Sequence, residues 1–146
     1  MKILVLNGPN LDLLGTREPE VYGAMTLPEL EGLCREWGRA LDALVECRQS
    51  NHEGELIEWL HGADHEGVAA VVLNAGGYTH SSVALRDAIA AIVAPVIEVH
   101  LSNVHARERF RRRSLIAPVC AGTISGLGPA GYRAAIEVLA RELPTA

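Results

Sequence analysis

The sequence predicts an α/β protein with a flavodoxin-like fold, a three-layer sandwich in which helices cover both faces of a five-stranded parallel sheet. Two observations predict this class. Short aliphatic runs alternate with amphipathic stretches along the 146 residues, which is the pattern of successive βα units. The aliphatic runs are nearly continuously apolar, as is typical of strands buried on both faces. Because no repeat or linker interrupts the pattern, we expect residues 1–146 to form a single domain.

The individual elements follow in order. The predicted strands are Lys2–Leu6, Ala43–Arg48, Ala69–Asn74, Val96–His100 and Val119–Ile124. The predicted helices are Leu27–Leu41, Glu53–Asp64, Ser82–Ile92, a short one around His105–Arg112, and Pro129–Leu143. Thr26 and Glu29 form a capping box at the start of the first helix, and Pro129 stands at a first helical position, where its missing N–H costs nothing. The last helix carries an apolar stripe at helical spacing, made of Tyr132, Ile136, Leu139 and Leu143.

Charge and cysteine usage exclude several classes of protein. The net charge of −5 argues against nucleic acid as a partner, because binding to a duplex needs a basic surface. No apolar run approaches the roughly 20 residues that span a bilayer, and the apolar part of residues 1–8 is too short for a signal peptide. Cys34, Cys47 and Cys120 are odd in number and widely separated, which favours reduced thiols in the cytoplasm.

The lysine content bears on the chemistry. Lys2 is the only lysine in the chain, and it opens the first predicted strand. This is a poor position for an amine that must attack a carbonyl and form a Schiff base. We therefore do not expect imine chemistry.

In a doubly wound sheet, ligands bind beyond the carboxyl ends of the strands, so we expect the site on the loops that follow the strands. The first of these loops, residues 7–25, is longer than most βα connections, and such loops are often lids or binding loops. It contains Asn10, Arg17 and Tyr22. An arginine beside a tyrosine stabilises the phenolate, which makes Tyr22 a candidate general base on a loop able to close over a substrate. An ordinary surface excursion is the alternative.

The fourth predicted strand ends in a second candidate group. Glu98 and His100 are two residues apart, so both side chains face the same side of the strand. A carboxylate in that position can hold an imidazole in its charged form, ready to act as an acid. The backbone N–H groups of Ser102 and Asn103 follow, and they can cradle a substrate carboxylate. The alternative is a structural Glu–His pair with a capping serine.

Polar and basic side chains near two other loops complete the candidates. After the third strand, Asn74 and His80 offer neutral hydrogen bonds suited to hydroxyl groups, and the paired glycines between them let a ligand approach the backbone. Ser81 or Ser82 is expected to cap the following helix. One basic cluster lies further along the chain, and one or two of its members could meet an anionic substrate. It comprises Arg107, Arg109, Arg111, Arg112 and Arg113.

Two patterns resemble cofactor or metal motifs, but each lacks a residue that such a site requires. Gly126–Gly131 fits G-x-G-x-x-G, yet the chain ends before the acidic ribose ligand of a dinucleotide site, so we interpret it as a turn and helix cap. His61 and His65 have the spacing of a metal-binding pair but lack the zincin glutamate between them, so exposed histidines are expected. We expect neither a metal nor an organic cofactor.

These segments resemble the type II 3-dehydroquinate dehydratase family along essentially the whole chain. The matching stretches are LNGPNLDLLGTREPEVYG (Leu6–Gly23), QSNHEGELI (Gln49–Ile57), LNAGGYTHSSVALRDA (Leu73–Ala88), EVHLSNVHARERFRRRS (Glu98–Ser114) and GTISGLG (Gly122–Gly128). The resemblance implies a single catalytic domain, a hydro-lyase, that converts 3-dehydroquinate to 3-dehydroshikimate in the shikimate pathway or in quinate breakdown. It implies anti elimination through an enolate without metal or imine.

The resemblance also implies catalytic roles. Tyr22 matches the base that removes the proton beside the ketone, and Arg17 matches the neighbour that keeps Tyr22 ionised. Asn10 is similar to the residue that stabilises the enolate oxygen, through a water. His100 matches the acid that protonates the departing hydroxyl, and Glu98 matches its orienting partner.

Further positions match substrate contacts. Leu101 and Ser102 match a backbone cradle for the substrate carboxylate, and Asn74, His80 and Arg111 match contacts to the carboxylate and ring hydroxyls.

Asp87 matches a substrate-binding residue that the family takes from an adjacent subunit. The resemblance therefore implies a homo-oligomer, a dodecamer built from trimers, in which a single subunit has an incomplete site. No nucleic-acid or membrane partner is implied.

Two rival functions use the same fold. A flavin- or nucleotide-binding protein would be coloured or stabilised thermally by its ligand. A signalling or assembly module of the receiver type would need an acidic cluster after the first strand, where this chain has Asn7, Gly8 and Asn10.

Overall fold

The computed structural model describes residues 1–16 and 18–142, with Tyr22 described by its backbone only. Within them, five parallel strands form one sheet in the order β2-β1-β3-β4-β5. The strands are β1 (Lys2–Asn7), β2 (Leu44–Gln49), β3 (Val68–Asn74), β4 (Val96–His100) and β5 (Gly122–Ser125). This arrangement confirms the predicted α/β, flavodoxin-like sandwich.

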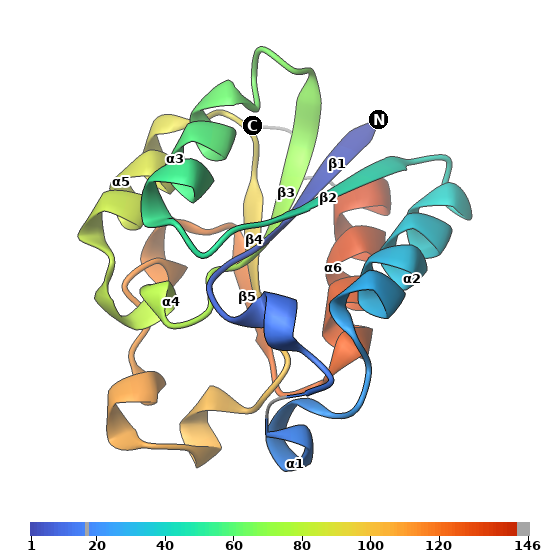
Figure 1. Cartoon of the computed structure of the whole chain (residues 1–146). Coiled ribbons are helices and arrows are strands. Elements are labelled where there is room, and N and C mark those ends of the chain that lie inside the picture. Colours follow the sequence, from blue (N-terminus) through green and yellow to red (C-terminus); the bar gives the residue numbers. More distant parts are fainter. Residues whose placement is uncertain (17, 143–146) are drawn as a thin grey trace.

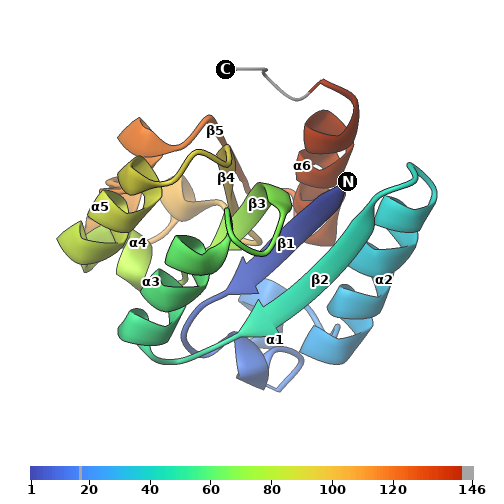
Figure 2. The same cartoon turned by 90° about the horizontal axis from the view of Figure 1, so that it is seen from above.

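Helices cover both faces of the sheet (Figures 1 and 2). On one face, α2 (Leu27–Arg39) packs against α6 (Pro129–Arg141), and on the other α3 (Glu53–Gly62) packs against α5 (Val83–Ala91). Each face has its own buried cluster of aliphatic side chains. These helices confirm the four long predicted ones, apart from their ends. Among the described helices, none combines the length and apolarity needed to cross a membrane.

Local signals in the sequence explain where these helices begin. The Thr26 hydroxyl accepts a hydrogen bond from Glu29 N at 3.4 Å, as the capping box requires. The Ser82 hydroxyl accepts one from Leu85 N at 2.9 Å, so Ser82 is the predicted serine cap of α5. Along α6 the predicted stripe is fully buried at Tyr132, Ile136 and Leu139, while Leu143 lies outside the described residues.

The predicted last strand was wrong at its start. Val119 belongs to a 3₁₀ helix, Ala117–Val119, and β5 begins only at Gly122. Strand pairing explains the difference, because β5 pairs with β4 from Ile97↔Gly122 to His100↔Ser125. The apolar side chain of Val119 packs instead against the core on the α3/α5 face.

The short helix predicted around His105–Arg112 was also wrong. Two 3₁₀ helices, Val104–Ala106 and Arg109–Arg112, occupy this segment, and Arg107 between them has an extended backbone. The Asn103 side chain caps the first of them by accepting a hydrogen bond from His105 N at 3.1 Å. The arginines of this segment therefore do not lie on one α-helical face.

Three segments that received no prediction of secondary structure lie at the carboxyl edge of the sheet. They are a 3₁₀ helix at Leu11–Leu13, α1 (Pro19–Tyr22) and α4 (Tyr78–Ser81). Figure 1 shows α1 and the segment after β4 below the ends of the strands. Leu11 of the 3₁₀ helix and His80 of α4 line the cavity at this edge, together with residues at the strand ends.

Candidate active site

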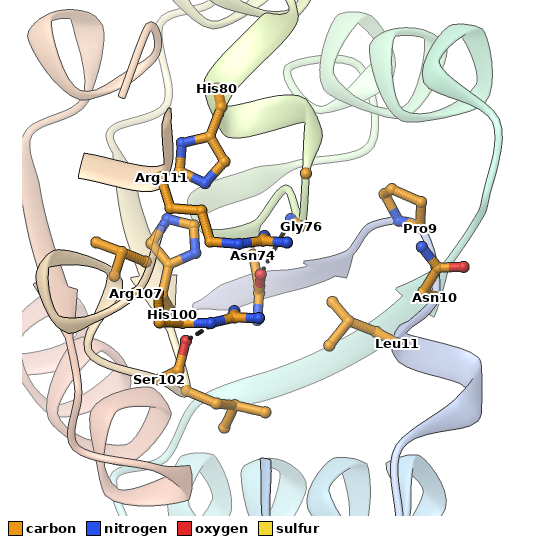
Figure 3. A pocket seen from close by; sticks show the side chains of 13 residues that line it. Pro9, Asn10, Leu11, Asn74, Gly76, His80, His100, Ser102, Arg107 and Arg111 are labelled. Atoms are coloured by element: carbon orange, nitrogen blue, oxygen red, sulfur yellow. Dashed lines mark hydrogen bonds between the residues drawn. The ribbon is translucent and has the colours of Figure 1, made fainter. Parts of the chain in front are cut away.

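A cavity of about 150 Å³ opens at the carboxyl ends of β1, β3 and β4. A volume of this size accommodates one six-membered ring. Seven of the residues predicted for the site line it, namely Asn10, Asn74, His80, His100, Leu101, Ser102 and Arg111. Side chains from all three strand ends converge there, with Arg107 and Arg111 reaching across from the segment after β4 (Figure 3).

Glu98 and His100 form the predicted pair on β4. Both side chains are buried, and His100 Nε2 lies 2.6 Å from Glu98 Oε2. This contact assigns the Nε2 proton to the bond with the carboxylate, so Nδ1 is the ring nitrogen available for chemistry on a ligand. His100 can therefore exchange a proton with a ligand through Nδ1 in the cavity that it lines.

Two hydroxyl groups hold the Glu98 carboxylate from other parts of the chain. Ser114 Oγ lies 3.0 and 2.9 Å from the two carboxylate oxygens, and Thr79 Oγ1 lies 3.3 Å from Oε2. A buried charge is tolerated where it is paired and hydrogen-bonded. Sequence reasoning missed both residues, because neither has a local pattern that links it to Glu98.

Asn74 and His80 lie near the carboxyl end of β3. The Asn74 amide donates to Tyr132 Oη at 2.8 Å and accepts from Gly76 N at 3.1 Å. His80 Nδ1 lies 2.8 Å from the carbonyl oxygen of Arg113, so in the neutral ring Nδ1 carries the proton and Nε2 is an acceptor. The predicted neutral hydrogen-bonding groups are thus held in defined orientations at the cavity wall.

Two members of the arginine cluster line the cavity, and they are Arg107 and Arg111. Arg111 is held by Glu108, with Nε 2.5 Å from Oε2, and its guanidinium stacks 4.9 Å from the Phe110 ring centroid. Arg107 lies 3.4 Å from Ser102 Oγ. The prediction named Arg111 as a substrate contact and missed Arg107. Both belong to the basic cluster, which was the sequence signal for cations at the site.

The backbone after β4 is held by the glycine-rich turn before α6. The carbonyl oxygens of His100 and Leu101 accept hydrogen bonds from Gly126 N at 3.3 Å and Gly128 N at 3.0 Å. Gly128 is also the N-cap of α6, as predicted for a turn and cap. This turn positions the 101–102 backbone, which is the candidate cradle for a carboxylate.

The first loop contributes Asn10, which lies across the cavity from the arginines (Figure 3). Arg17 lies outside the described residues, and so does the side chain of Tyr22. The backbone of Tyr22 ends α1, whose N-cap residue Glu18 approaches Arg107, with Oε2 3.9 Å from a guanidinium nitrogen. The helix that carries Tyr22 is therefore adjacent to the cavity wall.

Asp87 does not line this cavity. Its side chain is exposed on α5. The histidines of the rejected metal pair, His61 and His65, are also exposed, as predicted. Within the part of the chain that the structure describes, no three His, Cys, Asp or Glu side chains come together as a set of metal ligands.

Comparison with known proteins identifies the family of this chain. A family model described as "Dehydroquinase class II" matches residues 1–140. The chain is 58% identical over 141 residues to 3-dehydroquinate dehydratase of Thermus thermophilus, covering 97% of this chain and 95% of the relative. It is 57% identical over 141 residues to the protein of the same name from Deinococcus radiodurans, covering 97% and 99%.

Solved structures give the same result. The crystal structure of type II dehydroquinase from Butyrivibrio crossotus has a TM-score of 0.94 to this chain at 47% identity, and covers 95% of this chain and 97% of its own. That of type II dehydroquinase from Propionibacterium acnes has a TM-score of 0.92 at 45% identity, with 95% of each chain covered.

Proposed function

Because this chain belongs to the class II dehydroquinase family, it is a hydro-lyase of the 3-dehydroquinate dehydratase type, and we propose that it removes water from 3-dehydroquinate by anti elimination through an enolate. The product would serve the shikimate pathway or quinate breakdown. The observation that carries the proposal is the buried Glu98–His100 pair at the wall of a ring-sized cavity.

The first step is removal of a proton from the carbon beside the ketone. Tyr22 acts as the base in its phenolate form, and Arg17 keeps it ionised. The electron pair of the broken C–H bond moves to the ketone oxygen and forms an enolate. Asn10 stabilises that oxygen through a water, as an oxyanion donor does, and such a donor contributes on the order of 3 kcal/mol. The position of Asn10 at the cavity supports this role.

In the second step the enolate collapses and expels the hydroxyl group. His100 gives that group the Nδ1 proton, so that water leaves and a carbon–carbon double bond forms in conjugation with the ketone. The imidazole becomes neutral, and the phenol has gained the proton from carbon, so the two transfers balance. Glu98 supports the acid form by holding Nε2 at 2.6 Å.

The remaining site residues hold the substrate. The backbone of Leu101 and Ser102 receives the substrate carboxylate, while Asn74, His80 and Arg111 bind the carboxylate and ring hydroxyls. Arg107, which the geometry adds to this group, supplies a second positive charge to the same cavity. A guanidinium is suited to this task because its planar fork matches a carboxylate.

The proposal extends to assembly. Asp87 is exposed on α5, away from the cavity of its own chain. Its exposure leaves it free to reach a neighbouring subunit, and we infer from the family resemblance a homo-oligomer, a dodecamer of trimers, in which Asp87 completes the site of an adjacent subunit. Residues 1–146 then act as one catalytic domain.

Adding 3-dehydroquinate to the purified protein tests the activity, with formation of the enone followed by its ultraviolet absorbance. Tyr22→Phe and His100→Ala should each lower kcat by about 10²–10⁴-fold, the size of a general acid–base contribution. Borohydride added with substrate should leave the wild-type protein active, because no imine forms.

Each outcome separates the parts of the proposal. A wild-type protein that forms no enone would overturn the activity. Full turnover by Tyr22→Phe would remove Tyr22 as the base, and inactivation by borohydride would indicate a Schiff base in place of the enolate.

A further inference from the structure

The hydroxyl group of Tyr132 joins two asparagines beneath the cavity. Asn74 Nδ2 donates to this hydroxyl at 2.8 Å, and the hydroxyl donates to Asn7 Oδ1 at 2.6 Å. Asn7 and Asn74 are register partners at the ends of β1 and β3. The strand order reverses direction between these two strands, and ligands of such folds bind at that point. Tyr132 therefore connects the strand ends at the floor of the site.

The hydrogen bonds of Asn74 define how its amide meets a ligand. A side-chain amide has two N–H donors and one oxygen with two lone pairs. In Asn74, one N–H goes to Tyr132 and the oxygen accepts from Gly76 N at 3.1 Å. What remains is one donor and one lone pair, on a residue that lines the cavity. The contact to Tyr132 determines which direction the remaining donor takes.

The apolar stripe of α6 does not by itself require a hydroxyl at position 132. Phenylalanine would fill the same fully buried position beside Ile136 and Leu139. A buried hydroxyl is unfavourable unless it is hydrogen-bonded, and both bonds of this one go to asparagines at strand ends. Among the described residues, the Nδ2 atom of Asn7 is buried without a hydrogen-bond partner. The Asn7 amide is thus oriented toward Tyr132 even though its own donor is unsatisfied.

We propose that Tyr132 is a positioning residue, whose hydroxyl orients the Asn74 amide so that its remaining donor faces the substrate. Tyr132 does not line the cavity and acts through Asn74. Burial raises the pKa of Tyr132, so its hydroxyl stays protonated and keeps donating to Asn7 at neutral pH. The inference rests on the proposed function, because the ligand that Asn74 meets is the hydroxylated, carboxylated ring.

The test is Tyr132→Phe, measured by steady-state kinetics and by a crystal structure of the variant. We expect KM for 3-dehydroquinate to rise on the order of tenfold, as the loss of one binding contact does, with a much smaller change in kcat. In an Asn74→Ala background the same substitution should change KM by less than about twofold, because a residue that acts through Asn74 has no effect once that side chain is gone. The crystal structure should show the Asn74 amide turned from its wild-type orientation.

A matched control separates positioning from stability. Ile136→Val shortens a neighbouring, fully buried side chain of the same stripe, so it should lower the melting temperature and leave KM unchanged. Asn7→Ala removes the acceptor of the Tyr132 hydroxyl without altering α6, and it should raise KM in the same direction as Tyr132→Phe. It serves as the test if Tyr132→Phe does not fold.

Three results would overturn the inference. The first is a lower melting temperature with unchanged KM in both Tyr132→Phe and Asn7→Ala. The second is an equal change of KM by Tyr132→Phe with and without the Asn74 side chain, and the third is an Asn74 amide that keeps its wild-type orientation in the variant structure. A wild-type protein without dehydratase activity would overturn the proposed function instead, and the crystallographic measurement would still decide whether Tyr132 orients Asn74.

Discussion

The Glu98 carboxylate accepts hydrogen bonds from three side chains that come from different segments of the chain. His100 is its neighbour on β4, Thr79 lies in α4, and Ser114 follows the arginine segment. The Ser114 hydroxyl also accepts from Ala117 N at 3.0 Å, so it is held in place itself. Removing one partner of such a buried group leaves the others under-satisfied, which costs more than the hydrogen bond alone. The pairing of His100 therefore depends on residues outside the cavity.

The cysteine thiols provide a residue-level prediction that depends on pH. A hydrogen bond from the Cys34 thiol lowers the pKa of Cys47, whereas burial raises the pKa of Cys120 to about 12. The thiolate is the reactive form, and a lower pKa means that it is populated at lower pH. As pH rises from about 6 to 9, iodoacetamide should modify Cys47 before Cys120, as measured by peptide mass spectrometry.

The control for this labelling is Cys47→Ser, which should remove the early modification. Labelling of Cys120 first, or at the same rate as Cys47, would contradict the effect of the Cys34 hydrogen bond on the pKa of Cys47.

At the scale of elements, α2 contains two glycines whose surroundings differ in the space that they leave for a side chain. A Cβ at Gly32 would meet nothing within 4 Å, whereas a Cβ at Gly38 would lie 2.4 Å from Val45 Cγ2 and 3.0 Å from the Ala43 carbonyl oxygen. Gly38 is thus the point where α2 approaches β2 too closely for a side chain. No packing contact of this kind requires glycine at position 32.

We therefore expect alanine substitutions in α2 to have opposite signs. Gly32→Ala should raise the free energy of unfolding by about 0.5–1 kcal/mol, because alanine has the higher helix propensity. Gly38→Ala should lower it by about 1–3 kcal/mol through overpacking against Val45. Denaturant unfolding followed by circular dichroism measures both, and a common sign would contradict the packing of α2 on β2.

The boundaries of the helices and strands show where local sequence signals were sufficient to predict the structure. The starts of α2 and α5 followed from hydroxyl caps whose hydrogen bonds span only three residues. The start of β5 could not be predicted in this way, because it is determined by pairing with β4. Likewise, the arginine segment forms two 3₁₀ helices, since Asn103 caps the first and Arg107 is extended. The sequence still indicated that this segment supplies cations to the site.

At the scale of the whole molecule, the site lies where the parallel strands end on both sides of the reversal in strand order. Asn7 of β1 pairs in register with Gln49 of β2 and Asn74 of β3, so the polar ends of these strands lie side by side. Two separate cores on the faces of the sheet hold those ends in place. Rigid elements of this kind position a site more accurately than loops alone.

The proposed assembly predicts complementation between two inactive chains. Asp87→Ala and His100→Ala should each have little activity, while mixed oligomers contain sites that combine an intact His100 with an intact Asp87 from a neighbour. Co-refolding the two variants in equal amounts should recover about a quarter of the wild-type activity, because random mixing pairs the intact residues in that share of sites. Light scattering gives the mass of the assembly. Mixtures no more active than the separate variants would contradict the contribution of Asp87 across an interface.

The sequence by itself determined the βα alternation, the helix starts, the strand-end positions of the candidate residues and the family resemblance. It could do so because periodicity and caps depend on residues a few positions apart, and because parallel strands place their carboxyl ends at one edge. Only the tertiary structure decided which groups touch. The hydrogen bond between Ser114 and Glu98 joins residues 16 positions apart, and the one between Tyr132 and Asn7 joins residues 125 positions apart. Contacts over such separations depend on how the layers pack, and no local pattern records them.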